Sequence, residues 1–316
     1  MRVKFPFLFF SQLRLRLLSK PRRTDCVLTL CTVLCVTLAA GMPATAQELL
    51  PEQSAAKAKA ILRQTIAALG GDAYLNAHDS DCSGRVAQFG HNDELMGFTN
   101  FRDIWIYPDK NRTEYISKGQ NTLAAALLGI DDLSITRGGA LITVFNGQQG
   151  WILDKTGVSD QPEDLVKAFT EQVKSGMNNM LRSRMNEDGV EYHYAGSDLL
   201  DLKEADWIEF TDPEHRTLRL ALDRSTHLPL RWAVSVRDSE TRQRSETVTS
   251  YTQYIDIDGV KTPLSISKAQ NGRHTSQVFL TGCKYDSNFS SDLFTRNSLE
   301  QAATNKKGVK DAKSKK

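Results

Sequence analysis

The side chains best suited to acid–base or metal chemistry do not form a recognised catalytic pattern in this sequence. The chain contains no G-x-S-x-G, H-E-x-x-H, H-x-x-E-H, P-loop or C-x-x-C motif. Its histidines are scattered, without the spacing of metal ligands: His78, His91, His193, His215, His227 and His274. We therefore predict a protein that is not an enzyme and that uses no metal and no cofactor.

Acidic residues offer a second kind of chemistry. Asp79-Ser80-Asp81 and Asp131-Asp132 have carboxylates close together, and carboxylate oxygens are calcium ligands. Acidic residues in loops are also commonly just solvated. We favour this simpler interpretation at both places.

The first 46 residues have the three parts of a secretory signal peptide. A basic start precedes an apolar run from Cys26 to Ala40, and Ala44-Thr45-Ala46 has the A-x-A form of a cleavage site. The run has about 15 residues, fewer than the roughly 20 that a membrane-spanning helix needs. We therefore predict cleavage after Ala46 and export to the periplasm or out of the cell.

Two cysteines, Cys82 and Cys283, remain after the predicted leader is removed. In an exported chain they are plausible disulfide partners. Closing a loop of this length, about 200 residues, would stabilise the fold by up to about 5 kcal/mol in the chain-entropy model. Two separate buried thiols remain the alternative.

The net charge of +2 hides an acidic body. The leader carries seven basic residues and one acidic residue, so the rest of the chain has a net charge of −4. From Lys306 onward there are six lysines and one aspartate, so the body between the two basic ends has a net charge of −9. Such a body is not expected to bind nucleic acid. We assign residues 296–316 to a disordered basic tail that aids solubility or contacts anionic lipid headgroups as a peripheral membrane contact.

The elements that must position these residues are mostly strands. After a helix predicted from Ser54, as N-cap, to Leu69, where Gly70-Gly71 stop it, the apolar period becomes two from Ser83 onward. The run from Leu228 to Val236 is the clearest case of alternation. Strands are predicted near 82–90, 95–107, 112–118, 141–147, 150–155, 190–199, 205–212, 216–223, 227–238, 244–257, 261–270 and 274–286.

Turn signals separate these strands. Asp258-Gly259 and Asn271-Gly272 are typical of two-residue hairpins. A sheet of so many twisted strands curls, closes or splits rather than staying flat. We therefore predict a mainly β (α+β) fold in a single domain over residues 47–295. It is a strongly curved antiparallel sheet or incomplete barrel, with two to three helices at its mouth.

Two apolar segments interrupt the strands and are candidate lids. Residues 121–135 are apolar, with glycines on both sides that permit hinging, and the lid residues there are Leu123, Leu127 and Leu128. Residues 160–185 are predicted to form one amphipathic helix capped by Asp160 or Gln161, with Phe169 and Met177 on its apolar stripe. Ordinary packing of either segment against the sheet remains the alternative.

The order of several short motifs is more specific than any one of them. Gly70-Gly71 end the first helix, and the later motifs are IWIYPDKNRTE from Ile104, Phe145-Asn146-Gly147 followed by Trp151, Thr226-His227-Leu228-Pro229, and Tyr251-Thr252-Gln253-Tyr254 before Asp258-Gly259-Val260. This order resembles the outer-membrane lipoprotein-sorting superfamily, the LolA/LolB-like fold, over most of residues 54–294. It is also similar to the β domain that follows zinc-peptidase units in some exported bacterial proteins.

The resemblance implies an unclosed antiparallel barrel with a helical lid and an apolar cavity for acyl chains. Trp105 and Trp151 match aromatic strand positions of the family, so we expect them to line the cavity or to pack in the core. Tyr107, Phe145 and Trp232 are further candidates for the lining. At Tyr107 the well-known carrier of the family has an arginine that helps to hold its lid shut.

The expected function follows from this resemblance. It is a non-catalytic periplasmic binding or carrier protein for lipid-like or acylated ligands, including lipoproteins, with a role in lipoprotein sorting and outer-membrane biogenesis. The alternative is a protein-interaction module that acts with an exported peptidase or an envelope complex. The first function predicts an apolar cavity lined by aromatic side chains. The second predicts a filled interior and an exposed apolar patch near residues 121–135.

Overall fold

In the computed structural model the chain divides into two units, Met1–Glu48 and Leu49–Lys316. The structure describes residues 49–116, 140–237 and 242–304, all in the second unit. The predicted signal peptide, the lid residues Leu123, Leu127 and Leu128, and residues 305–316 of the basic tail lie outside the described residues. Among the described residues, no helix is both long enough and apolar enough to cross a membrane.

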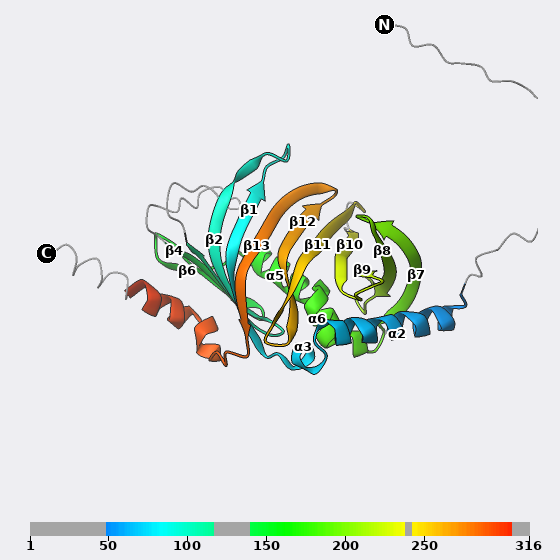
Figure 1. Ribbon diagram of the computed structural model, residues 1–316. Coiled ribbons are helices and arrows are strands. Elements are labelled where there is room, and N and C mark those ends of the chain that lie inside the picture. Colours follow the sequence, from blue (N-terminus) through cyan, green and yellow to red (C-terminus); the bar gives the residue numbers. More distant parts are fainter. Residues whose placement is uncertain (1–48, 117–139, 238–241, 305–316) are drawn as a thin grey trace, which may run out of the picture. The chain divides into compact units, whose positions relative to one another are not determined.

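A single antiparallel sheet dominates the second unit (Figure 1). Its strands follow the order β6-β5-β4-β3-β2-β1-β13-β12-β11-β10-β9-β8-β7, so two meanders meet where β1 pairs with β13. The sheet is curved, and its edge strands β6 and β7 do not pair with each other, so it stays open. This confirms the predicted fold class.

The strand bounds follow the predicted alternation closely. The first meander contains β1 (Asp79–Phe89), β2 (Leu95–Ile106), β3 (Lys110–Ile116), β4 (Ala140–Asn146), β5 (Gln149–Leu153) and β6 (Val158–Asp160). The second contains β7 (Glu191–Leu200), β8 (Lys203–Thr211), β9 (Thr217–Asp223), β10 (Pro229–Arg237), β11 (Arg244–Ile257), β12 (Val260–Gln270) and β13 (Arg273–Tyr285). Only β6 was not predicted, because three residues are too few to show a period.

Two predicted hairpins set the register of the strands that meet at the middle of the sheet. Asp258 and Gly259 have φ of 53° and 81°, and Asn271 and Gly272 have φ of 51° and 79°. Positive φ at both central residues defines the type I′ turn, whose twist matches that of the flanking strands. The turns therefore fix β11 against β12 and β12 against β13.

The first helix starts earlier than the sequence indicates. α2 spans Pro51–Leu69 with Leu50 at its N-cap, and it is followed by α3 (Asp72–Asn76). Ser54 is buried inside α2 rather than capping it, because its hydroxyl accepts a 2.8 Å hydrogen bond from the Tyr194 amide of edge strand β7. The helix ends at Gly70 as predicted. A Cβ at that position would collide with the carbonyl oxygen of Gly259.

The helix predicted over residues 160–185 is instead broken into three pieces. α5 (Glu163–Ser175), α6 (Met177–Arg182) and the 3-10 turn η1 (Arg184–Asn186) follow one another, and Asp160 belongs to β6 rather than to a cap. Gly176 is extended, and a Cβ there would approach the Gln172 carbonyl oxygen to 2.9 Å. The break changes the chain direction, so that Phe169 and Met177 contact different parts of the sheet.

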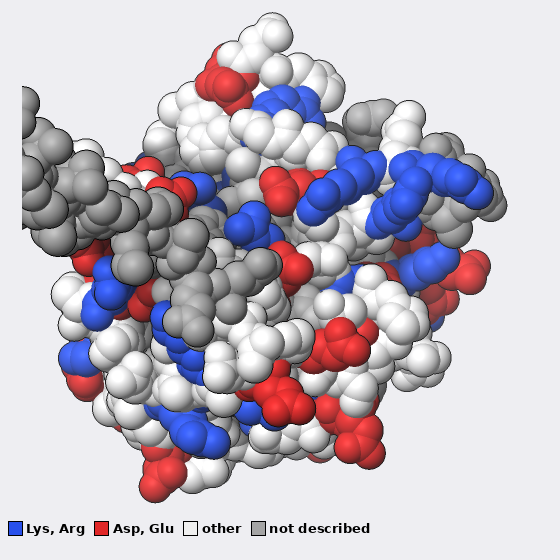
Figure 2. All heavy atoms as spheres, turned by 90° about the vertical axis from the view of Figure 1, so that its right-hand side faces the viewer, with Lys and Arg blue, Asp and Glu red and all other residues white. Residues whose placement is uncertain are grey.

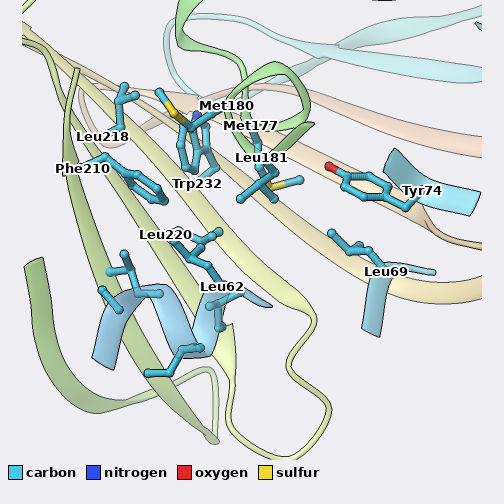
Figure 3. Close-up of a cluster of buried hydrophobic side chains, with 14 of the residues drawn as sticks. Leu62, Leu69, Tyr74, Met177, Met180, Leu181, Phe210, Leu218, Leu220 and Trp232 are labelled. Carbon is cyan, nitrogen blue, oxygen red and sulfur yellow. The ribbon is translucent and has the colours of Figure 1, made fainter. Parts of the chain in front are cut away.

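One face of the sheet, which we call the inner face, is covered by α2 and α6 over the second meander (Figure 3). Its fully buried core joins Leu62 of α2 and Leu181 of α6 to Phe210 of β8 and Leu220 of β9. Alternation along each strand puts its apolar side chains on this face. Removing this much apolar surface from water holds the helices against the sheet.

The opposite, outer face carries a second core under a C-terminal helix. Residues 296–304, assigned from sequence to a disordered tail, are helical, and Leu299 is fully buried against Ile104 and Val144 with Phe294 of η2 (Ser291–Phe294). The buried Arg112 of β3 donates to the Leu293 carbonyl and to the Ser298 hydroxyl, at 3.3 Å each. The fold therefore extends past the predicted boundary at residue 295.

The pairing of β1 with β13 brings Cys82 and Cys283 together. Cys82 lies directly opposite Cys283 in register, and the two form a disulfide across 201 residues of chain. The bridge therefore joins β1 and β13, which are the first and last strands along the chain and neighbours in the sheet.

Candidate functional site

Three of the predicted site residues meet where α5 crosses the inner face. Trp105 of β2 and Phe145 of β4 lie on one row of the sheet, each opposite Asn111 of β3. The Phe169 ring of α5 stacks on Phe145 with centroids 4.5 Å apart and on Trp105 at 5.8 Å. Two candidate lining residues thus contact a candidate lid residue directly.

Tyr107 extends this stack and receives a cation. Its ring lies 6.4 Å from that of Trp105, and its hydroxyl is 3.0 Å from the Ser80 hydroxyl. The Arg182 guanidinium of α6 lies 4.2 Å from the Tyr107 ring and 4.5 Å from the Tyr74 ring. Burial raises the pKa of Tyr107, so the phenol stays neutral. The arginine that contacts Tyr107 therefore comes from α6 and not from the strand β2 that precedes Tyr107.

The other predicted site residues have different surroundings. Trp232 is buried in the inner core and donates a 3.0 Å hydrogen bond to the Ser175 carbonyl at the end of α5. Met177 packs in the same core. Trp151 lies opposite Val144, so it faces the C-terminal helix on the outer face and cannot line an inner cavity. A tryptophan in a strand shows burial, but not the face on which it is buried.

Part of the inner face lies outside both cores. Trp232 points inward and pairs with Thr249 of β11. Tyr251, two residues further along β11, therefore also points inward. It is level with Ile266, Val278 and Val86 on the next three strands. The next inward row contains Leu280, Gly84 and Phe101. Neither hydrophobic core includes the following partly exposed residues: Phe101, Ile266, Val278 and Leu280.

An acidic group lies beside this apolar surface. Asp103 accepts side-chain hydrogen bonds from Trp105 at 2.7 Å, Asn111 at 2.9 Å and Thr113 at 2.7 Å. These donors sit on neighbouring positions of β2 and β3, so the strand register builds the site. Three hydrogen bonds to one carboxylate satisfy most of its acceptor capacity.

Lys268 of β12 lies on the inner face, and its sequence position alone did not single it out. It is level with Thr249 and Ser276, and it interacts electrostatically with Asp103 although β1 and β13 lie between their strands. Only the register of several strands shows that this lysine turns inward. The sequence shows merely a lysine in an alternating strand.

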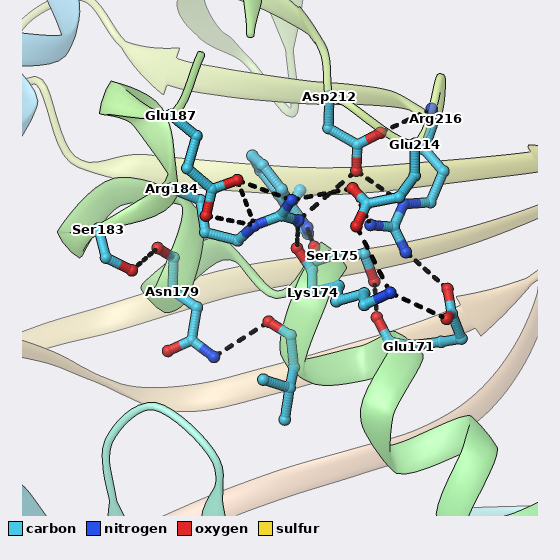
Figure 4. Close-up of polar contacts among 12 residues, drawn as sticks. Glu171, Lys174, Ser175, Asn179, Ser183, Arg184, Glu187, Asp212, Glu214 and Arg216 are labelled. Atoms are coloured by element: carbon cyan, nitrogen blue, oxygen red, sulfur yellow. Dashed lines mark hydrogen bonds and ion pairs between the residues drawn. The ribbon is translucent and has the colours of Figure 1, made fainter. Parts of the chain in front are cut away.

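Charged side chains anchor the segment from α5 to η1, which we call the covering segment, to the turn between β8 and β9 (Figure 4). Arg216 bonds the buried carboxylate of Asp212 at 2.7 Å and Glu171 of α5 at 2.6 Å. Arg184 of η1 bonds Glu214 at 2.9 Å and the Lys174 carbonyl. The network therefore holds the C-terminal part of α5 and the η1 turn to the turn between β8 and β9.

This network also shifts a pKa. Partial burial alone would raise the pKa of Glu214, but its hydrogen bond with Arg184 and the charges of Arg184, Arg216 and Lys174 outweigh this and lower it to about 2. The carboxylate is therefore ionised at any physiological pH.

The acidic run at residues 79–81 has a structural role. The Asp79 carboxylate accepts hydrogen bonds from the backbone amides of Ser287 at 2.8 Å and Phe289 at 3.2 Å, and Asp81 pairs with Arg102 at 2.7 Å. Within the described ranges, no group of three or more His, Cys, Asp or Glu side chains could hold a metal ion. Asp131-Asp132 lies outside these ranges.

The exposed charges are mixed in sign. On the face seen in Figure 2, acidic and basic side chains are interspersed over the described surface. Several charges of the described residues are paired, as Arg219 is with Glu209 and Arg224 with Asp206. On this face the described residues form no broad basic stripe of the kind that polyanions bind.

No family model matches this chain, and no curated protein matches it in sequence. Solved structures do match. A domain described as an outer membrane lipoprotein-sorting protein from Vibrio parahaemolyticus has 11% identity and a TM-score of 0.49, covering 78% of this chain and 99% of its own. A DUF1329 family protein from Desulfovibrio piger has 14% identity and a TM-score of 0.48, covering 77% and 98%.

A LolA superfamily protein from Nitrosomonas europaea has 12% identity and a TM-score of 0.46, covering 77% of this chain and 99% of its own. The matches thus include the superfamily that the sequence resembles. Identities this low compare folds, and a fold does not specify a ligand or a partner.

Proposed function

We propose that the partly exposed part of the inner face binds acyl chains, and that the protein is a non-catalytic carrier or sensor of lipid-like or acylated ligands. The observation that carries this proposal is the group of inward apolar side chains outside both cores, around Val278 and Leu280. Soluble proteins rarely leave contiguous apolar surface uncovered without a binding role. Each methylene removed from water contributes about 0.8 kcal/mol, so one acyl chain supplies ample driving force.

The proposed location is the periplasm. The sequence supports export through its predicted signal peptide. A disulfide between Cys82 and Cys283 supports an oxidising compartment, because disulfides persist there and are rare in the cytosol. Both features are expected of a protein that handles lipids between membranes.

Adjacent residues of β13 provide a matched test. Val278 turns inward, opposite Val86, while its neighbour Phe279 is 42% exposed on the outer face, opposite Arg85. In Val278→Glu, a carboxylate would have to be desolvated beside the ligand, so we expect binding of a fluorescent acyl probe to weaken at least about tenfold. Phe279→Glu should bind the probe as the wild type does, and circular dichroism checks that both variants fold.

Equal weakening by the two variants, or none by either, would contradict binding on the inner face. Absence of probe binding to the wild-type chain would contradict the proposed function itself. In each case the probe is a neutral acyl chain, so that the measurement reports apolar burial rather than charge.

A second candidate function is docking of a partner protein on the outer face. Phe98 is 44% exposed there, with the Arg85 guanidinium 4.6 Å from its ring, and Phe279 lies opposite Arg85. Aromatic residues with an arginine are typical of interface hot spots. The Phe279→Glu variant tests this candidate as well, because it should lose partner capture while keeping acyl binding.

A further inference from the structure

Lys268 places a positive charge on an otherwise apolar and hydroxyl-bearing part of the inner face. Its row across the sheet contains Trp232 of β10, Thr249 of β11, Ser276 of β13 and Gln88 of β1. Trp232 fixes the direction of this row, because it packs in the inner core. Ile266, two residues before Lys268, points the same way and is partly exposed.

Lys268 lies on the inner face of a curved sheet (Figure 1). Its side chain is exposed to solvent, and the charge of Asp103 is close enough to favour the protonated ammonium. The curvature of the sheet explains how Asp103 on β2 can influence a lysine on β12.

The ammonium has no hydrogen-bond or ion-pair partner among the described residues. The Asp103 carboxylate is already engaged, since its two oxygens accept from Trp105, Asn111 and Thr113. Two other lysines in β strands have partners: Lys203 pairs with Asp223 at 3.1 Å and Lys261 with Asp256 at 3.3 Å. An ammonium without a partner beside inward apolar side chains is a candidate site for a ligand of opposite charge.

We propose that Lys268 binds the carboxylate of a long-chain fatty acid whose acyl chain lies along Ile266, Val278 and Leu280. This inference rests on the proposed function and names its ligand class. The neighbouring hydroxyls of Thr249 and Ser276 can donate further hydrogen bonds to the carboxylate. One lysine close to an aspartate suits a single negative charge, whereas phosphate groups are usually met by several cations or by arginine.

The test compares two ligands that differ only in charge. Hexadecanoate and its methyl ester compete with the neutral fluorescent probe for the full chain. We expect the wild type to prefer the acid by about tenfold, the size of one hydrogen bond to a charged group. Lys268→Met keeps the apolar stem, so it should bind the ester as before and lose the preference for the acid.

Lys284→Met is the matched control, because Lys284 lies opposite Asp81 on the outer face of β13 and should keep the preference. A preference that survives in Lys268→Met would overturn the inference, as would a wild type that binds acid and ester equally. Those outcomes leave acyl binding intact. If instead neither ligand displaces the probe and the probe itself does not bind, the proposed function fails and this inference fails with it.

Discussion

Arg216 shows how single residues hold the covering segment in place. Its guanidinium bonds Asp212, Glu214 and Glu171, and its own side chain and that of Asp212 are 7% and 0% exposed. The sequence shows Asp212 and Arg216 on either side of a turn. It cannot show Glu171, which lies 45 residues away and meets them only through the fold.

Arg216→Met should lower the free energy of unfolding by about 3 kcal/mol, because the buried Asp212 carboxylate loses its 2.7 Å ion pair and keeps only the 3.6 Å contact with Arg184. Urea unfolding measures this value. Arg224→Met is the control: Arg224 pairs with Glu204 where both side chains are exposed, and with Asp206 only at 3.6 Å, so its loss should cost less than about 1 kcal/mol. Equal effects of the two substitutions would contradict the role given to the network.

Two carboxyl groups with a lowered pKa predict that the fold becomes less stable in acid. Burial raises the pKa of Glu214, but Arg184, Arg216 and Lys174 lower it to about 2. For Asp223 burial likewise acts upward, and hydrogen bonds from Ser225 and Lys203 lower its pKa to about 2. A carboxyl whose pKa is lower in the folded state stabilises the fold fully above its unfolded value, and this stabilisation is lost as the pH falls towards 2.

We therefore expect the free energy of unfolding to fall between pH 5 and about pH 2, and to fall less steeply in Glu214→Gln. Chemical unfolding at several pH values measures both slopes. A variant slope equal to that of the wild type would show that Glu214 is not one of the groups responsible.

At the scale of elements, the sequence predicts a strand correctly where an alternating apolar pattern is bounded by turn signals. The strands from β7 to β13 were predictable because apolar residues alternate along them and turns, two of them Asp258-Gly259 and Asn271-Gly272, separate them. The break at Gly176 was not, because the apolar stripe continues from Phe169 through Met177 to Leu181 without interruption. Only the two separate contact surfaces, the Trp105 stack and the Trp232 core, explain why the helix ends there.

The C-terminal helix gives a prediction at this scale. A chain that ends at Thr295 loses the fully buried Leu299 and the contacts of Ala302 and Ala303, so its free energy of unfolding should fall by about 2 kcal/mol or more. A chain that ends at Thr304 keeps all the described contacts of this helix and serves as the control. Equal stability of the two chains would mean that residues 296–304 do not belong to the fold.

At the scale of the whole described unit, the sheet decides what each residue can do. Trp105, Trp151 and Lys268 all occur in strands, but only the register across the open sheet shows that the first and last turn inward and the second outward. The sequence therefore could not separate the inward Trp105 from the outward Trp151. An aromatic residue in a strand can be packed in either core, and sequence gives no sign of which.

The most direct test of acyl binding is mass spectrometry of small molecules extracted from the natively purified full chain. We predict that acyl species, enriched in free fatty acids, accompany the wild-type protein and are absent from Val278→Glu. A wild-type protein that carries no acyl species and takes up none when incubated with hexadecanoate would contradict it.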